Sequence, residues 1–227
     1  MTTATARALY ADTALVSVGC MDKSQMKGFC QQHRVRAIVD ASHPYAVRVS
    51  SQAIAVAAEL KLPYLRYERE NYRSKSTSIK PNLIELPSIE HLVAGDYLSD
   101  RRVLLTIGCK ALTQFQAWHA KATLYARILP QVASLEMAIA AGFTSDRLIA
   151  IRPPISAATE SALWQQWNIS LVVTKASGTA GGEDIKREVA ASLGIPLIVI
   201  TRPQISYPQQ TSKLEDVVFF CRQAIAS

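Results

Sequence analysis

The sequence alternates between short apolar runs and segments with helical periodicity along most of its length. Runs such as 171–174 (LVVT) and 197–200 (LIVI) carry apolar residues at successive positions, so both faces of each strand must be buried. A sheet with one solvent-facing side would alternate apolar and polar residues instead. The pattern therefore predicts parallel strands connected by helices, which is the doubly wound α/β architecture.

The expected elements follow one another in strand–helix order. The expected strands cover 14–18, 37–40, 63–66, 83–86, 103–107, 124–129, 148–151, 170–174 and 196–200. The expected helices cover 22–33, capped by Asp22, then 46–60, 88–98, 111–119, 135–141, 159–167, 184–193 and 214–226. So many strands in one sheet would be unusual. We therefore expect two lobes, residues 1–90 and 91–227, each with its own sheet.

Composition limits the class of protein. The chain has 227 residues, of which 49% are hydrophobic and 19% charged, so a folded core is expected rather than disorder. No apolar stretch of about 18 residues and no secretory signal is present, and the four scattered cysteines are typical of reduced cytoplasmic thiols. The formal net charge of +7 suits an anionic partner, but the basic residues are dispersed, so no nucleic acid is expected.

The segment Asp40–Ala46 (DASHPYA) follows a buried strand and opens a helix. Proline is accepted in a first helical turn, so Ser42 or His43 is predicted to cap the helix beside backbone amides that face a ligand. Asp40 can then orient groups of the loop or a ribose hydroxyl. The spacing alone fits a capped turn with His43 on the surface equally well.

Arginine and tyrosine alternate in the segment 64–73 (YLRYERENYR). Arginine suits carboxylates and phosphates, and tyrosine rings suit a flat conjugated ligand. Composition alone slightly favours a solvated stretch between domains. Arg127 lies within the apolar run 124–129, where an unpaired charge is costly, so it is expected either to pair or to point into a cleft.

Residues 175–183 (KASGTAGGE) form the only glycine-rich loop, between an expected strand and an expected helix. The backbone amides of 177–182, together with Lys175, fit an anion-binding nest. The spacing is neither a P-loop nor a GxGxxG fingerprint, and a plain strand-to-helix loop fits equally well. The segment 106–110 (TIGCK) is a weaker candidate, because Gly108 permits a tight turn before a helix N-terminus.

Covalent and metal chemistry are not expected. The four histidines have no metal-ligand spacing, and neither a GxSxG motif nor a Ser/His/Asp order is visible. No metal site is therefore predicted.

Several segments occur in one order along nearly the whole chain: DASHPYA at 40–46, PYLRYER at 63–69, TIGCKAL at 106–112, ARILP at 126–130, TKASGTAGGEDIK at 174–186 and IPLIVITRP at 195–203. Together they resemble the precorrin-6A reductase family of cobalamin biosynthesis. The first of these segments and the pattern KxSGxxGG within 175–182 are specific in combination.

The resemblance implies two Rossmann-like lobes with a cleft between them, and a cytoplasmic NADPH-dependent oxidoreductase acting on a CH–CH group. The implied reaction reduces one double bond of a tetrapyrrole polycarboxylate, precorrin-6A or its cobalt form, to the precorrin-6B level. Neighbouring pathway enzymes are further candidate partners. The alternative is a tetrapyrrole-binding protein without catalysis, or an otherwise inactive truncated homologue.

The resemblance also implies the site residues. His43 is the candidate proton donor. The expected cofactor contacts are Thr2, Thr3, Arg7, Gly19, Asp40 and Ser42. The expected substrate contacts are Tyr45, Arg66, Thr106, Gly108, Arg127, Lys175, Ser177, Gly178, Gly181 and Gly182.

The start of the sequence departs from the family pattern. Family members usually begin with a strand, a Gly-Gly-Thr-type loop that cradles the cofactor diphosphate, and a first helix. This sequence begins Met-Thr-Thr-Ala, which looks like the tail of the second strand. We therefore expect the first strand, loop and helix to be missing from the N-terminal lobe.

Overall fold

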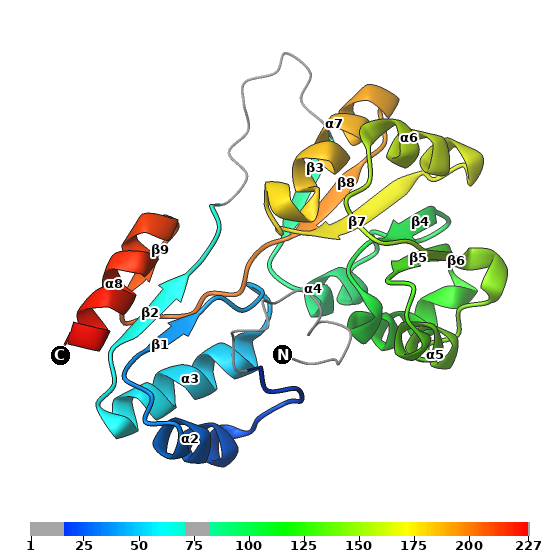
Figure 1. Ribbon diagram of the computed structural model, residues 1–227. Helices are drawn as coiled ribbons and strands as arrows, with labels where there is room; N and C mark the ends of the chain where they lie inside the picture. Colours follow the sequence, from blue (N-terminus) through cyan, green and yellow to red (C-terminus); the bar gives the residue numbers. More distant parts are fainter. Residues whose placement is uncertain (1–15, 71–81, 227) are drawn as a thin grey trace. The chain divides into compact units, whose positions relative to one another are not determined.

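The computed structural model describes residues 16–70 and 82–226, which fall into two compact units (Figure 1). Unit 1 consists of Met1–Arg69 and Gln204–Ser227, and unit 2 consists of Glu70–Pro203. The α/β class with parallel sheets is confirmed, because every strand pair among the described residues is parallel.

These bounds differ from the expected division at residue 90. Strand β3 (Leu83–Leu86) pairs with β8 (Leu197–Ile200), which places it in the sheet of unit 2. The C-terminal helix α8 (Leu214–Ala226) returns to unit 1, where it packs on β2 (Tyr64–Tyr67). The chain therefore enters unit 2 and leaves it again, which a division at a single position cannot represent.

Unit 1 contains a three-stranded sheet in the order β1-β2-β9. Its other elements are α2 (Lys23–Gln32), β1 (Ile38–Asp40), α3 (Val47–Leu60) and β9 (Gln210–Thr211). Helix α2 begins as predicted: the Asp22 side chain accepts a hydrogen bond from the Gln25 amide at 2.8 Å, and the Gln25 side chain accepts one from the Asp22 amide at 3.0 Å. Helices α2 and α3 pack on each other.

Two expected features of unit 1 differ from the structure. Residues 16–18 of the expected strand 14–18 are not in a strand, and 14–15 lie outside the described residues. Strand β9 was not predicted, because Gln210 and Thr211 form a polar two-residue strand without apolar periodicity.

Unit 2 contains a six-stranded sheet in the order β3-β8-β7-β4-β5-β6 (Figure 1). Its strands beyond β3 and β8 are β4 (Arg102–Leu105), β5 (Thr123–Ile128), β6 (Leu148–Ala150) and β7 (Leu171–Lys175). Its helices are α4 (Ile89–Ala94), η1 (Cys109–Ala120), α5 (Val132–Ala140), η2 (Ser145–Arg147), α6 (Ala157–Gln166), η3 (Thr179–Gly181) and α7 (Glu183–Leu193). The expected helix 111–119 is the 3₁₀ helix η1. Among the described residues no helix has the length and apolar character to cross a membrane.

The order of the strands divides the helices of unit 2 between two faces. Connections between parallel strands are right-handed, so α4, η1 and α5 cover one face, and α6 and α7 cover the other. The contacts agree, because η1 packs against α4 and α5, whereas α6 packs against α7. The direction of winding reverses between β4 and β7. Ligands of open α/β sheets bind at such a reversal, beyond the carboxyl ends of the strands.

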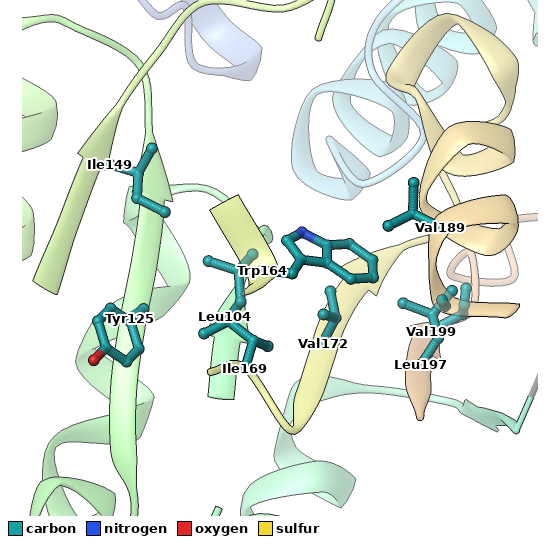
Figure 2. Close-up of a cluster of buried hydrophobic side chains, with 10 residues drawn as sticks. Leu104, Tyr125, Ile149, Trp164, Ile169, Val172, Val189, Leu197 and Val199 are labelled. Atoms are coloured by element: carbon teal, nitrogen blue, oxygen red, sulfur yellow. The ribbon is translucent and has the colours of Figure 1, made fainter. Parts of the chain in front are cut away.

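One hydrophobic cluster of unit 2 lies between the sheet and the α6–α7 layer (Figure 2). Trp164 of α6 is fully buried there among Leu104, Val172 and Val189. Its indole Nε1 donates a hydrogen bond to Glu160 Oε2 at 3.0 Å. The polar edge of the ring is thus paired, and its apolar face fills the core.

We expect Trp164→Ala to lower the free energy of unfolding by about 4 kcal/mol, because it leaves a large cavity and removes a partner of a buried carboxylate. Trp164→Phe, which keeps most of the volume, should cost less. Urea unfolding followed by circular dichroism measures both. Equal stability of the two variants would contradict this account of the core.

Candidate functional site

Asp40 at the end of β1 is the centre of a buried polar network in unit 1. Its Oδ1 accepts hydrogen bonds from the Ser42 amide at 3.0 Å and from Arg66 Nη1 at 3.0 Å, and its Oδ2 accepts one from the Tyr64 hydroxyl at 2.9 Å. Burial alone would raise the pKa of Asp40, but hydrogen bonds from Ser42, Ser50 and Tyr64 hold it below its ordinary value. Of the two roles predicted for Asp40, the geometry favours orienting the loop.

Arg66 is fully buried, so it presents no surface for the expected contact with substrate. Its Nη1 also donates to Ser42 Oγ at 3.1 Å, and its Nε donates to Glu68 at 3.0 Å. Its guanidinium lies 5.2 Å from the ring centroid of Tyr207, and its Nη2 has no hydrogen-bond partner among the described residues. Arg66 thus fixes the end of β1 from the neighbouring strand β2.

The predicted cap of the second helix is wrong. Helix α3 begins at Val47, and its N-cap is Ala46, whose side chain makes no capping hydrogen bond. The Ala46 amide donates to the His43 carbonyl at 2.7 Å, which closes a separate turn before the helix. Ser42 is instead held by Arg66, and its Oγ lies 3.3 Å from Ser50 Oγ.

His43 lies exposed in that turn. Its Nδ1 accepts a hydrogen bond from the Tyr45 amide at 3.3 Å, and its ring centroid lies 5.6 Å from that of half-buried Tyr45. Because Nδ1 is an acceptor, the neutral imidazole carries its proton on Nε2. Its Nε2–H lies on the side of the ring away from that hydrogen bond.

Gly19 borders a hollow of about 410 Å³ in unit 1. The lining includes the apolar side chains of Val18, Met21 and Phe29 and the amide side chains of α2. Apolar side chains beside a few polar groups are typical of the lining of a small-molecule site. Thr2, Thr3 and Arg7, the other expected cofactor contacts, lie outside the described residues.

The second group of predicted residues gathers at the reversal point of unit 2. Thr106 follows β4, and its amide and its Oγ1 both donate to the Val173 carbonyl of β7, at 2.8 and 3.0 Å. Gly108 follows, exposed and with φ of +84°. Lys175 ends β7, and burial lowers the pKa of its half-buried amine. The structure therefore brings 106–108 and 175 to one edge of the sheet.

The backbone amides of the expected nest are mostly occupied within the loop itself. The amides of Ser177, Gly178, Gly181 and Gly182 donate to the Lys175 carbonyl, Glu183 Oε2, the Gly178 carbonyl and the Thr179 carbonyl, at 2.7 to 2.9 Å. These four amides are already bonded within the loop or to Glu183, so the geometry favours the plain strand-to-helix loop over the anion nest at these positions. An anion at this edge would have to be bound by side chains rather than by these four amides.

Arg127 pairs, as one of the two alternatives predicted. Its Nη1 forms an ion pair with Glu160, which is 2% exposed and also accepts from Trp164. The pair lies under the carboxyl end of β5, and its charge is already compensated.

Four buried or half-buried partners were not predicted from the sequence. Tyr207 lies against Arg66, Glu160 pairs with Arg127, and Glu183 and Lys186 hold the glycine-rich loop. Glu183 and Lys186 follow the glycines at the start of a helix, and this position in the sequence could have identified them as partners of the loop. In residues 16–70 and 82–226, no group of three or more His, Cys, Asp or Glu side chains could hold a metal ion.

We expect Asp40→Asn to lower the free energy of unfolding by about 3 kcal/mol near neutral pH, because the buried Arg66 charge loses the more deeply buried of its two carboxylate partners, Asp40 and Glu68. The pKa of Asp40 is lowered in the folded protein, so its contribution is present above the ordinary pKa of 3.8 and lost as pH falls through the lower folded value. The difference between wild type and variant should therefore shrink in acid. Urea unfolding over a pH series measures this, with exposed Asp100→Asn as control, and a constant difference would contradict it.

Comparisons with known proteins agree with this architecture. The family model described as "Precorrin-6x reductase CbiJ/CobK" matches residues 1–222. The solved structure of "CobK precorrin-6A reductase" has a TM-score of 0.77 and 22% identity, and the match covers 95% of this chain and 82% of that one, which shows the shared fold.

Two relatives are similar in sequence. The "Cobalt-precorrin-6A reductase" of a Synechocystis strain is 43% identical over 232 residues, which cover 100% of this chain and 87% of the relative. That of Priestia megaterium is 35% identical over 208 residues, which cover 89% and 79%. The chain therefore belongs to the CbiJ/CobK family of precorrin-6x reductases.

Proposed function

We propose that the protein is an NADPH-dependent reductase of a tetrapyrrole in cobalamin biosynthesis. The substrate is precorrin-6A or its cobalt form, and the product is at the precorrin-6B level. The observation that carries this proposal is the family match over residues 1–222, together with 43% identity to a protein named cobalt-precorrin-6A reductase.

In this proposal, unit 2 binds carboxylates of the substrate. Lys175 supplies the positive charge, and Ser177 supplies a hydroxyl group at the same edge of the sheet, whereas the Thr106 hydroxyl is already bonded to the Val173 carbonyl. A half-buried ammonium gains more from an anion than an exposed one does, because less water screens the charge. Exposed Gly108 leaves room beside these groups, since no atom lies within 4 Å of where its Cβ would be.

Unit 1 supplies the cofactor contacts and the proton donor. Gly19 and its hollow would hold the adenine end of NADPH, while Ser42 lies beside the His43 turn. When bound, NADPH supplies the hydride. Reduction of a carbon–carbon double bond also needs a proton on the second carbon. In this proposal the exposed His43 donates it as the imidazolium and is left as the neutral imidazole.

The test is anaerobic turnover of cobalt-precorrin-6A and of precorrin-6A with NADPH. We expect loss of NADPH absorbance together with a product that has gained two hydrogens. Binding of the tetrapyrrole without loss of NADPH would support the non-catalytic alternative. Comparing NADPH with NADH in the same assay tests the choice of cofactor.

We expect His43→Ala to lower kcat on the order of 100-fold, because a positioned proton donor is lost, while the KM for NADPH stays near that of wild type. His91→Ala, an exposed histidine of α4, is the matched control. Steady-state kinetics at saturating substrate measures the effect. Unchanged turnover of His43→Ala would exclude His43 as the proton donor.

We expect Lys175→Met to raise the KM for the tetrapyrrole about tenfold, since a charge-assisted contact to a carboxylate is lost. The KM for NADPH should stay unchanged, because Lys175 lies in unit 2. The same kinetics measure both constants. An unchanged tetrapyrrole KM would remove Lys175 from the substrate contacts.

A further inference from the structure

The glycine loop, residues 176–182, is tied at both ends to the first turn of α7. Glu183 Oε2 accepts a hydrogen bond from the Gly178 amide at 2.9 Å. Lys186 Nζ donates to the carbonyl of Gly181 at 2.9 Å and to that of Gly182 at 2.8 Å. Two side chains of one helical turn thus hold the start and the end of the loop.

Lys186 lowers the stability of the folded protein unless its buried ammonium is compensated. Only 2% of it is exposed, and a buried ammonium costs free energy unless it is paired. Burial and the charge of Arg127 lower the pKa of Lys186 to about 8, against the opposing effects of Glu160, Glu183 and Asp184. An apolar side chain would fill the same space without this cost, but it could not hold the two carbonyl groups.

The loop tolerates little change of shape. Gly178 has φ of +70°, and a Cβ there would lie 3.0 Å from the Glu70 carbonyl oxygen. A Cβ at Gly181 would overlap the Ser177 side chain. Gly181 therefore packs directly against the Ser177 side chain, so the positions of the Gly181 backbone and of Ser177 are coupled.

We propose that Lys186 and Glu183 are positioning residues for substrate binding: by tying the glycine loop to α7, they set the place of Ser177 beside Lys175. This inference rests on the proposed function, because it takes that edge of unit 2 as the site for the tetrapyrrole carboxylates. Neither residue contacts the substrate in this proposal.

The experiment compares wild type with Lys186→Met, Lys186→Arg and the matched control Lys121→Met, an exposed lysine of the same unit. We expect Lys186→Met to raise the KM for cobalt-precorrin-6A about tenfold, since two hydrogen bonds to the loop are lost, with little change in kcat or in the KM for NADPH. Lys186→Arg, which keeps the charge and the donors, should restore part of the affinity.

Amide hydrogen exchange of the same variants, without substrate, reports on the loop independently. We expect faster exchange confined to residues 175–186 in Lys186→Met. If wild type turns over no tetrapyrrole, the proposed function is wrong. Amide hydrogen exchange still tests whether Lys186 holds the glycine loop. Unchanged exchange, or faster exchange with an unchanged tetrapyrrole KM, would overturn the inference.

If Lys186→Met does not fold, Glu183→Ala tests the same loop, because it removes the hydrogen bond between Glu183 and the Gly178 amide. In this variant the rate of amide hydrogen exchange at Gly178 should rise, and the KM for the tetrapyrrole should rise as well. Normal values for both would overturn the inference through this second variant.

Discussion

Parallel pairing is the constraint on which both units depend. Each strand must be followed by a crossover that brings the chain back to the same end of the sheet, so the carboxyl ends of all strands collect at one edge. In unit 2 this places Thr106 beside Val173, although 67 residues separate them in sequence. Polar residues that follow different strands thereby become neighbours without any turn that joins them directly.

The outline of the fold could be predicted because apolar runs and helical periodicity are local. Strand 83–86 and helix 214–226 have the predicted bounds, and Asp22 caps α2 as expected. The start of α3 could not be predicted from Pro44 alone. Proline is allowed in a first helical turn but also in a separate turn, and the hydrogen bond from the Ala46 amide to the His43 carbonyl decides between them.

The sequence identified which residues belong to the candidate site better than it identified what each of them does. Arg66 and Asp40 were expected to meet ligands, yet they meet each other across adjacent strands in the register Asp40↔Arg66. The amides of the glycine loop were one candidate for an anion nest, but the Gly178 amide is bonded to Glu183, which lies just beyond the loop. Whether a hydrogen-bond donor can reach a ligand depends on which groups the tertiary fold places next to it. A local sequence motif does not contain this information.

The buried charges of the molecule gather beneath these two loop regions. Asp40 and Arg66 lie under the His43 turn, and Glu160, Glu183 and Lys186 lie near or under the glycine loop. Buried ion pairs rarely add net stability compared with well-packed apolar side chains, although breaking one is costly. These pairs therefore add little net stability over apolar packing, although Glu160 also accepts the indole hydrogen bond of Trp164 in the core. The placement of these buried charges fits a requirement that the His43 turn and the glycine loop each keep a single conformation. Ion pairs and hydrogen bonds are directional and can impose such a conformation, whereas apolar packing is not directional and cannot.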